Sequence, residues 1–196
     1  MKLDTITKYQ LLKICEAFSD YKFENDEKGL YYLCKGRDGR IRFVKGYALF
    51  CILSGWLNTC SYKKEGYICI QESCDRISAR GMIKFYYGII AGMGLFGGIK
   101  FGINFIRAGK PINQLLKKSG YVHIRMLVIG KGYQGMGYMR NLVEIAFDRA
   151  REKNVPCIVS TDSMDKAKKY EHLGFKIYQI RRLAEHSSEY DMIWYK

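Results

Sequence analysis

The segment VIGKGYQGMGYMRNLVEIAF, residues 128–147, constrains the fold of this chain more than any other part of the sequence. An apolar strand pattern ends there, four glycines follow within eight residues, and a helical pattern begins. The glycines are Gly130, Gly132, Gly135 and Gly137. Glycine lets backbone N–H groups approach a ligand without an intervening Cβ. A helix N-terminus adds unpaired N–H groups with a partial positive charge. The segment therefore predicts a binding site for an anion such as a pyrophosphate.

Two common phosphate-binding motifs fit this segment less well. The P-loop pattern G-x-x-x-x-G-K-[ST] is absent, because no Lys-Ser or Lys-Thr follows the glycines. The spacing G-x-G-x-x-G is met by Gly130, Gly132 and Gly135, but a dinucleotide site also needs repeated βαβ units and an acidic residue about 20 positions further on. Here the next strand pattern ends in Ser160 and Thr161. Dinucleotide binding is therefore the weaker interpretation.

Helical patterns dominate the N-terminal part of the chain. We expect helices over 5–19, part of 26–36 and part of 40–54. Asp4 or Thr5 is the expected N-terminal cap of the first helix. Gly36 and Gly39 predict a turn between the second and third helices.

Strand patterns follow. WLNTCSY (56–62) and YICIQE (67–72) are rich in aromatic and β-branched residues and flank KKEG, which predicts a β-hairpin whose partner strand is 121–129. The helix after the glycine segment has an apolar face and ends at Asn154 and Pro156. That face consists of Leu142, Val143, Ala146, Phe147 and Ala150. We expect a strand at 157–161, a helix at 165–173 that stops at Gly174, and strands at 175–180 and 191–195.

The stretch FYYGIIAGMGLFGGI, residues 85–99, is apolar and rich in glycine. It has 15 residues between Lys84 and Lys100, whereas a membrane-spanning helix needs about 20 apolar residues. We therefore expect no transmembrane segment. A buried helical pair or a wall of an acceptor pocket is the favoured interpretation, and association with a membrane surface stays open as an alternative.

Composition favours a single globular domain over 1–196 in the cytoplasm. The seven cysteines include no C-x-x-C pair, so we expect reduced thiols and no metal site. The N-terminus MKLDTITKYQ has no apolar signal region. The net charge of +14 comes from short, scattered basic pairs, which do not favour a nucleic-acid-binding arm.

Two motifs in order resemble those of the GNAT acetyltransferases. Gln134 to Met139 (QGMGYM) is similar to the family loop [QR]-x-x-G-x-[GA], and Met126-Leu127-Val128 precedes it as the family's strand does. Tyr170 to Phe175 (YEHLGF) is similar to the family element Tyr-x-x-x-Gly-Phe. The resemblance covers 121–180. It implies an α/β (α+β) fold with a mixed, mostly antiparallel central sheet flanked by helices on both faces. Within the one domain, 1–120 would form the acceptor side and 121–196 the acetyl-CoA-binding half.

The resemblance also implies roles for individual residues. Backbone groups of Leu127 and Val128 would bind the acetyl carbonyl and the pantetheine arm of acetyl-CoA, and Tyr170 would protonate the departing thiolate. The predicted cofactor-binding residues are Met126, Leu127, Val128, Gln134, Gly135, Met136, Gly137, Tyr138 and Met139.

Two residues are candidates for the general base. His123 lies on the strand before the loop, where alternation predicts that His123, Arg125 and Leu127 share one face. Glu72, at the end of the hairpin, is its rival. A structural role for His123 stays open.

The predicted activity is transfer of the acetyl group of acetyl-CoA to a small-molecule or peptide amine, by direct attack in a ternary complex. An amine linked to RNA or to the ribosome is an alternative acceptor. A non-catalytic CoA-binding module and a homodimer also stay open.

Overall fold

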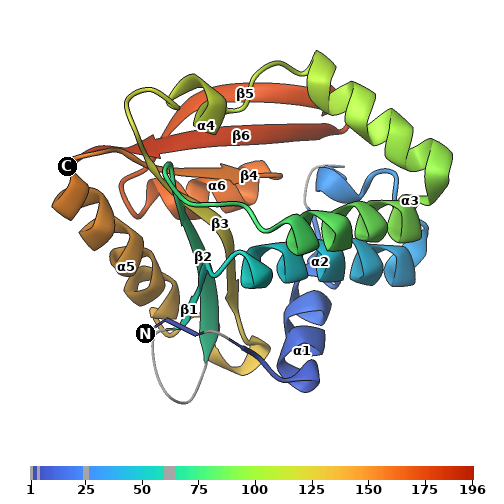
Figure 1. Ribbon diagram of the computed structural model, residues 1–196, viewed down its shortest axis with the longest axis horizontal. Helices are drawn as coiled ribbons and strands as arrows, with labels where there is room; N and C mark the ends of the chain where they lie inside the picture. The colour runs from blue at the N-terminus through green and yellow to red at the C-terminus, as the bar shows by residue number, and fades with distance from the viewer. Residues whose placement is uncertain (1, 4, 24–26, 60–64) are drawn as a thin grey trace.

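The computed structural model describes residues 2–3, 5–23, 27–59 and 65–196. Its centre is a six-stranded sheet with the order β1-β2-β3-β4-β6-β5 (Figure 1). The strands are β1 Leu57–Thr59, β2 Gly66–Glu72, β3 Val122–Ile129, β4 Cys157–Thr161, β5 Lys176–Ala184 and β6 Ser187–Trp194. The pair β3–β4 is parallel and the other pairs are antiparallel. The predicted mixed, mostly antiparallel sheet is confirmed. The pairing of the two predicted hairpin strands, and of the second with its partner strand, is also confirmed, whereas 60–64 of the predicted hairpin lie outside the described residues.

Helices cover both faces of this sheet (Figure 1). They are α1 Lys8–Ser19, α2 Gly36–Leu53, α3 Ala79–Arg107, α4 Ile112–Leu115, α5 Tyr138–Lys153 and α6 Met164–Glu171, with short 3₁₀ turns at Gly29–Tyr31 and Lys131–Tyr133. The α5 and α6 helices pack on one face, and α1 and α2 pack on the other with α3 outside them. The predicted flanking of the sheet is therefore confirmed.

The core under α5 follows directly from the sequence pattern. All five residues of the predicted apolar face of α5 are buried against strand residues such as Ile68 and Val122. Phe147 stacks on Trp194 with ring centroids 4.1 Å apart. The α5 helix ends at Asn154, whose φ of 51° lies in the left-handed region that a C-terminal cap often adopts.

The N-terminal helices differ from the prediction in their boundaries. The α1 helix begins at Lys8, and its N-cap is Thr7, which forms a capping box with Gln10. Thr5 is thus not the cap, and Asp4 lies outside the described residues. The described part of 26–36 contains only the 3₁₀ turn before α2 begins at Gly36. The predicted turn at Gly36 and Gly39 is therefore wrong, because both glycines lie in the first turn of α2.

Glycines allow α2 and α3 to pack backbone against backbone. A Cβ on Gly39 would lie 2.6 Å from the carbonyl oxygen of Gly92, and a Cβ on Gly46 would lie 2.7 Å from the Cα of Gly88. Real Cβ atoms do not come that close to other atoms, so each contact is possible only because glycine has no side chain. Gly39, which looked like a turn signal, is therefore a packing position, and its partner Gly92 lies more than fifty residues away in sequence. Gly36 has open space around it and a φ of 63°.

The prediction of a buried helical pair for 85–99 is wrong. This stretch lies within α3, a helix of 29 residues that bends at Gly94, where φ is 75°. One face of α3 packs on α2, and the other is exposed. Among the described residues, α3 is the one helix long and apolar enough to cross a membrane, and 22% of its most apolar window is buried. We call its exposed row the apolar strip, which comprises Ile83, Tyr87, Ile90, Phe96, Ile99 and Ile106.

Candidate active site

The central feature of the candidate site is the divergence of β3 and β4. Their parallel pairing runs from Val122–Cys157 to Ile124–Val159 and then stops. Among the described strands, β4 pairs only with β6 beyond this point, while β3 continues to Ile129 with β2 on its other side. Within the described part of the chain, the second half of β3 therefore presents an edge without a neighbouring strand on the β4 side. Such an edge offers backbone groups to a ligand that lies between the two strands.

A β-bulge at Arg125 reverses the direction of side chains in the middle of β3. Cys69 pairs with Met126 and Ile70 pairs with Ile124, so Arg125 is an extra residue. As a result, Leu127 packs on the α5 side of the sheet, whereas Met126 and Val128 pack on the α2 side. The predicted common face of His123, Arg125 and Leu127 is wrong, because simple alternation does not survive the extra residue.

The bulge is held from two directions. The hydroxyl of Tyr47 on α2 donates to the carbonyl oxygen of Arg125 at 2.9 Å. The Arg125 Nε donates to the Gln71 side chain at 2.7 Å, and its guanidinium lies 5.9 Å from the Trp56 ring. These contacts fix the position at which the alternation of side chains along β3 changes. They therefore fix which backbone groups of β3 face the space between β3 and β4.

The glycine loop is bare at its outer surface. Gly135 and Gly137 both have φ of 78°, and a Cβ at either position would meet nothing within 4 Å. The side chains of Gln134 and Met136 are exposed, so neither is buried over the loop. The α5 helix begins directly after Gly137 without a side-chain cap. The loop and the helix N-terminus thus have the open geometry that an anion site requires.

Met139 occupies the position where the family loop has Gly or Ala. Its side chain is half-buried and packs against the core cluster that also contains Tyr170. Leu127 packs against the same cluster. The structure therefore brings the first turn of α5, the strand edge and the candidate acid into one cluster, and Met139 points inward rather than over the loop.

Tyr170 lies on α6 and is 7% exposed. Its ring packs edge-on against Phe175 with centroids 5.5 Å apart. Burial raises the pKa of the Tyr170 hydroxyl well above its ordinary value, with a smaller contribution from Cys157. A raised pKa keeps the hydroxyl protonated at neutral pH, as a proton donor requires.

His123 is 3% exposed and lies in the paired, closed part of β3, between Gln71 and Ile158. Its Nδ1 has no hydrogen-bond partner among the described residues. Burial, and then the charge of Arg125, lower the pKa of the imidazole well below its ordinary value. The ring is neutral but enclosed, so the structure does not bring it to an acceptor.

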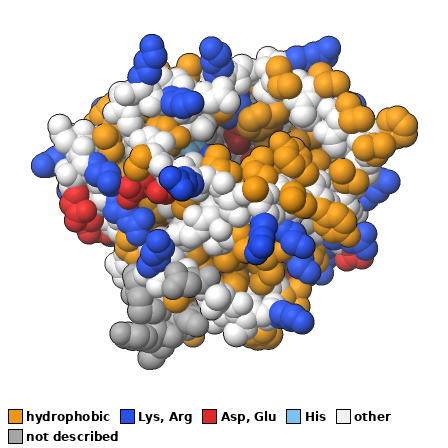
Figure 2. Space-filling view, viewed as in Figure 1, with side chains coloured by type: hydrophobic (Ala, Val, Ile, Leu, Met, Phe, Trp, Pro, Cys, Tyr) orange, Lys and Arg blue, Asp and Glu red, His pale blue; other side chains and the backbone are white. Residues whose placement is uncertain are grey.

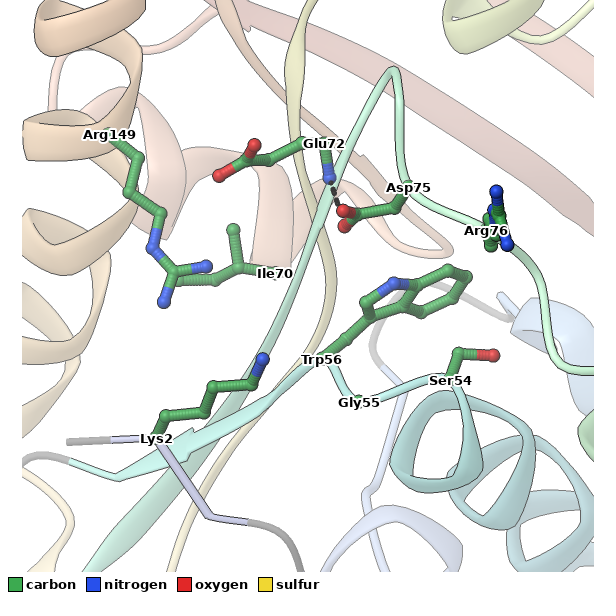
Figure 3. A pocket seen from close by; sticks show the side chains of 9 residues that line it. All are labelled: Lys2, Ser54, Gly55, Trp56, Ile70, Glu72, Asp75, Arg76 and Arg149. Carbon is green, nitrogen blue, oxygen red and sulfur yellow. Dashed lines mark hydrogen bonds between the residues drawn. The ribbon is translucent and has the colours of Figure 1, made fainter.

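Glu72 lies at the opposite end of the sheet from the glycine loop. It pairs with Val122, seven residues before Ile129, which corresponds to about 23 Å along a strand. Its carboxylate forms an ion pair of 3.0 Å with Lys153. It also lines a cavity of about 270 Å³ that contains the side chains of Lys2 and Arg149 (Figure 3). The structure therefore separates Glu72 from the predicted cofactor loop.

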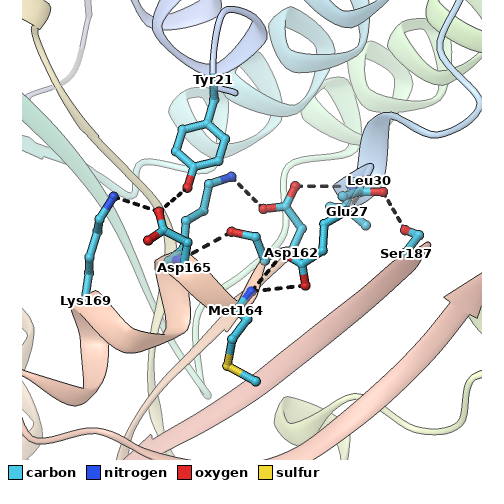
Figure 4. Close-up of polar contacts among 11 residues, drawn as sticks. Tyr21, Glu27, Leu30, Asp162, Met164, Asp165, Lys169 and Ser187 are labelled. Atoms are coloured by element: carbon cyan, nitrogen blue, oxygen red, sulfur yellow. Dashed lines mark hydrogen bonds and ion pairs between the residues drawn. The ribbon is translucent and has the colours of Figure 1, made fainter. Parts of the chain in front are cut away.

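A polar network that no sequence motif indicates joins the segment after α1 to α6 and β6 (Figure 4). Glu27 accepts from the Met164 N–H at 3.0 Å and from the Tyr190 hydroxyl at 2.8 Å. Tyr21 donates to Asp165 at 2.7 Å. These partners are more than 130 residues apart in the chain, so no local pattern could reveal them.

Asp162 extends the same network at the end of β4. Its carboxylate forms a 2.6 Å ion pair with Lys166 and accepts the Leu30 N–H at 3.2 Å. A cavity of about 840 Å³ adjoins this network on the side of α1 and α2. Its lining includes Asp20, Phe23, Glu27, Tyr31 and Arg40. The cavity lies on the half of the chain that the sequence assigned to the acceptor.

The fold and the loop together define the class of acyltransferase that the sequence predicted. The sequence model of the acetyltransferase (GNAT) family matches residues 52–175, and the chain belongs to this family. The predicted family is therefore confirmed.

A relative of this chain carries the same class name. An uncharacterized N-acetyltransferase of Schizosaccharomyces pombe is 33% identical over 89 residues, which cover 44% of this chain and 37% of that protein. The chain thus spans little more than a third of the length of this relative.

Solved structures share the fold over nearly the whole chain. Arylalkylamine N-acetyltransferase 2 of Aedes aegypti superposes with a TM-score of 0.56 at 12% identity, covering 96% of this chain and 95% of that one. The polyamine N-acetyltransferase of Drosophila melanogaster gives a TM-score of 0.52 at 12% identity, covering 94% and 96%. At this identity the likeness concerns the fold.

Proposed function

We propose that this chain transfers the acetyl group of acetyl-CoA to a primary amine by direct attack in a ternary complex. The observation that carries the proposal is the bare glycine loop at the start of α5, beside the unpaired edge of β3. A diphosphate needs several backbone N–H donors at close range. A pantetheine arm needs an extended neighbour with free peptide groups, and the edge after Ile124 supplies one.

In the proposed mechanism the protein contributes binding and proton transfer. Backbone N–H groups of 134–139 hold the diphosphate of the co-substrate, and peptide groups of Leu127 and Val128 hold the pantetheine arm and polarise the thioester carbonyl. The neutral amine attacks this carbonyl carbon, a C–N bond forms, and the C–S bond breaks. Tyr170 donates its proton to the departing sulfur. Neither His123 nor Glu72 is placed to take the proton of the amine, so water is the acceptor of that proton in this mechanism.

We assign the acceptor to the cavity beside α1 and α2. Its aromatic rings, including Phe23 and Tyr31, suit the apolar part of a small amine. The structural neighbours are named for arylalkylamines and polyamines, which supports a small-molecule amine as the first class to test. A peptide amine is the second.

The cytoplasm is the compartment that we propose. All six cysteines that the structure describes are free thiols, which suits a reducing environment.

Calorimetric titration with acetyl-CoA tests the proposed loop. Gly137→Trp should weaken binding at least about tenfold, because the new side chain fills the space above the helix N-terminus. Gly109→Trp is the matched control, since Gly109 also has a positive φ, of 95°, and open space around it, but lies outside the loop. Equal binding by all three proteins would remove the loop from the site.

A transfer assay tests the chemistry separately. The wild type is incubated with acetyl-CoA and a panel of arylalkylamines, polyamines and peptides, and release of free CoA thiol is measured. We expect turnover with at least one class of small amine. Tight binding of acetyl-CoA without turnover of any amine would contradict the proposed transfer and indicate a CoA-binding module.

A further inference from the structure

The apolar strip of α3 exposes more hydrophobic side-chain surface to solvent than a surface helix of a globular protein usually does. Phe96 is 87% exposed, Ile106 is 81% exposed and Tyr87 is 71% exposed. In the space-filling view, hydrophobic side chains gather over the region of α3, and Lys and Arg side chains lie around them (Figure 2). Contiguous exposed apolar surface of this kind marks an interaction site.

The charged residues of the segment that contains α3 have one sign. Residues 76–118 contain eight Lys and Arg residues and no Asp or Glu. All eight cationic side chains are exposed, among them Arg80, Lys84, Lys100 and Arg107 on α3 itself. A cationic margin around an apolar face is complementary to a surface that is apolar inside and anionic outside. An anionic lipid bilayer has this composition.

The same charges disfavour a second copy of this chain as the occupant. Two strips that faced each other would bring two sets of these cations together, and like charges across an interface are unfavourable. A bilayer that contains acidic lipids neutralises them instead.

The packing of α3 on α2 argues against a spanning helix. The contacts Gly39–Gly92 and Gly46–Gly88 hold the two backbones together along the first arm of α3. The α2 helix carries Arg37, Asp38, Arg40, Arg42 and Lys45. Such a charged partner is too costly to place in the hydrocarbon core, so the pair can only lie at a bilayer surface.

We propose that the apolar strip of α3 is a peripheral membrane-binding surface that inserts into the headgroup region of anionic bilayers. The bend at Gly94 places Phe96 at the junction of the two arms of α3. The margin cations contact acidic headgroups, and the strip contacts the upper part of the acyl chains. This proposal does not depend on the acetyl-transfer reaction.

Vesicle co-sedimentation of the full chain tests the proposal. Vesicles of phosphatidylcholine are compared with vesicles that contain about 30% phosphatidylserine, and we expect at least about tenfold tighter binding to the latter. Phe96→Ser with Ile99→Ser should lower this binding at least about tenfold. Tyr9→Ser with Leu12→Ser on α1 is the control, because these residues are also exposed, at 68% and 47%, and should bind as the wild type does.

A second pair of variants tests the charges. Lys84→Glu with Lys100→Glu should reduce binding to the anionic vesicles. Lys168→Glu with Lys176→Glu, which changes the net charge equally at exposed sites on α6 and β5, should reduce it much less. Unfolding curves show that each variant is folded.

Three results would overturn the proposal. They are equal binding to both kinds of vesicle, unchanged binding after Phe96→Ser with Ile99→Ser, and binding that resists alkaline extraction as a spanning helix does. The proposal would also be overturned if the wild type did not bind vesicles but formed a dimer that Phe96→Ser disrupts. That result would assign the strip to self-association.

Discussion

Gly46 of α2 and Gly88 of α3 lie in direct contact, so that a Cβ built on either would be 2.7 Å from the Cα of the other. The two helices therefore meet at their backbones, with Gly39 and Gly92 in a second contact at the far end of the interface. The position of α3, and with it the apolar strip, depends on the absence of side chains at these points.

Gly88→Ala should destabilise the protein, because the added methyl group must push the two backbones apart. Overpacking of this kind costs about 1–3 kcal/mol of unfolding free energy. Gly102→Ala is the matched control in the same helix, since a Cβ there meets nothing within 4 Å, and it should be neutral or slightly stabilising. Urea unfolding of both variants gives the comparison, and a similar loss in both would show that the contact is not tight.

Tyr170→Phe should lower kcat for acetyl transfer by about 100-fold while leaving KM for acetyl-CoA nearly unchanged. The change removes only the hydroxyl that donates the proton to the leaving sulfur. Tyr178→Phe is the control, because Tyr178 is 48% exposed on β5. Steady-state kinetics with saturating amine measures the effect. Wild-type kcat in Tyr170→Phe would mean that this hydroxyl takes no part in the reaction.

His123 should make stability depend on pH. Burial lowers the pKa of its imidazole in the folded protein, so the unfolded chain, with a pKa of about 6.5, binds the proton first. The stabilisation is present above pH of about 6.5 and is lost as the pH falls, by up to about 1.4 kcal/mol per pH unit. His123→Gln should remove this part of the slope, and His172→Gln, at an exposed position, should not. The free energy of unfolding is measured against pH for each protein. If its pH dependence were the same in the wild type and in His123→Gln, the imidazole would titrate in the folded state as it does in the unfolded chain.

Glu27→Ala should lower the free energy of unfolding by about 1–3 kcal/mol, because the Met164 N–H and the Tyr190 hydroxyl both lose their acceptor. Tyr190→Phe removes one of these two bonds. If the pair interacts as the structure shows, the double variant should be less destabilised than the sum of the two single changes. Strict additivity in denaturant unfolding would contradict the contact.

The C-terminal half of the fold was predictable because each of its elements carries its own signal. The apolar face of α5, the positive φ of Gly174 after α6 and the glycine loop all follow from short stretches of sequence. The candidate cofactor loop is predictable for the same reason, since the chemistry of residues 134–139 depends on backbone freedom and on the helix that follows.

The features that were not predictable are the packing of α2 on α3, the polar network around Glu27 and the faces of β3. They depend on residues that are distant in sequence or on an extra residue in a strand. Gly39 looked like a turn because nothing near it reveals Gly92 as its neighbour. Glu27 showed no function because Met164 and Tyr190 are remote. The face of Leu127 was misassigned because alternation alone does not show where a strand contains an extra residue.

That extra residue, Arg125, sets a limit on how this strand can vary. Deletion of this one position would let the strand alternate regularly from Ile124, and would leave Met126 and Val128 facing α2 and Leu127 facing α5. The deletion would remove the bulge itself, with the carbonyl oxygen that accepts from Tyr47 and the guanidinium that donates to Gln71. An alignment of this chain with a strand that lacks the extra residue therefore needs its gap at Arg125, because without that gap it would compare residues from opposite layers of the protein.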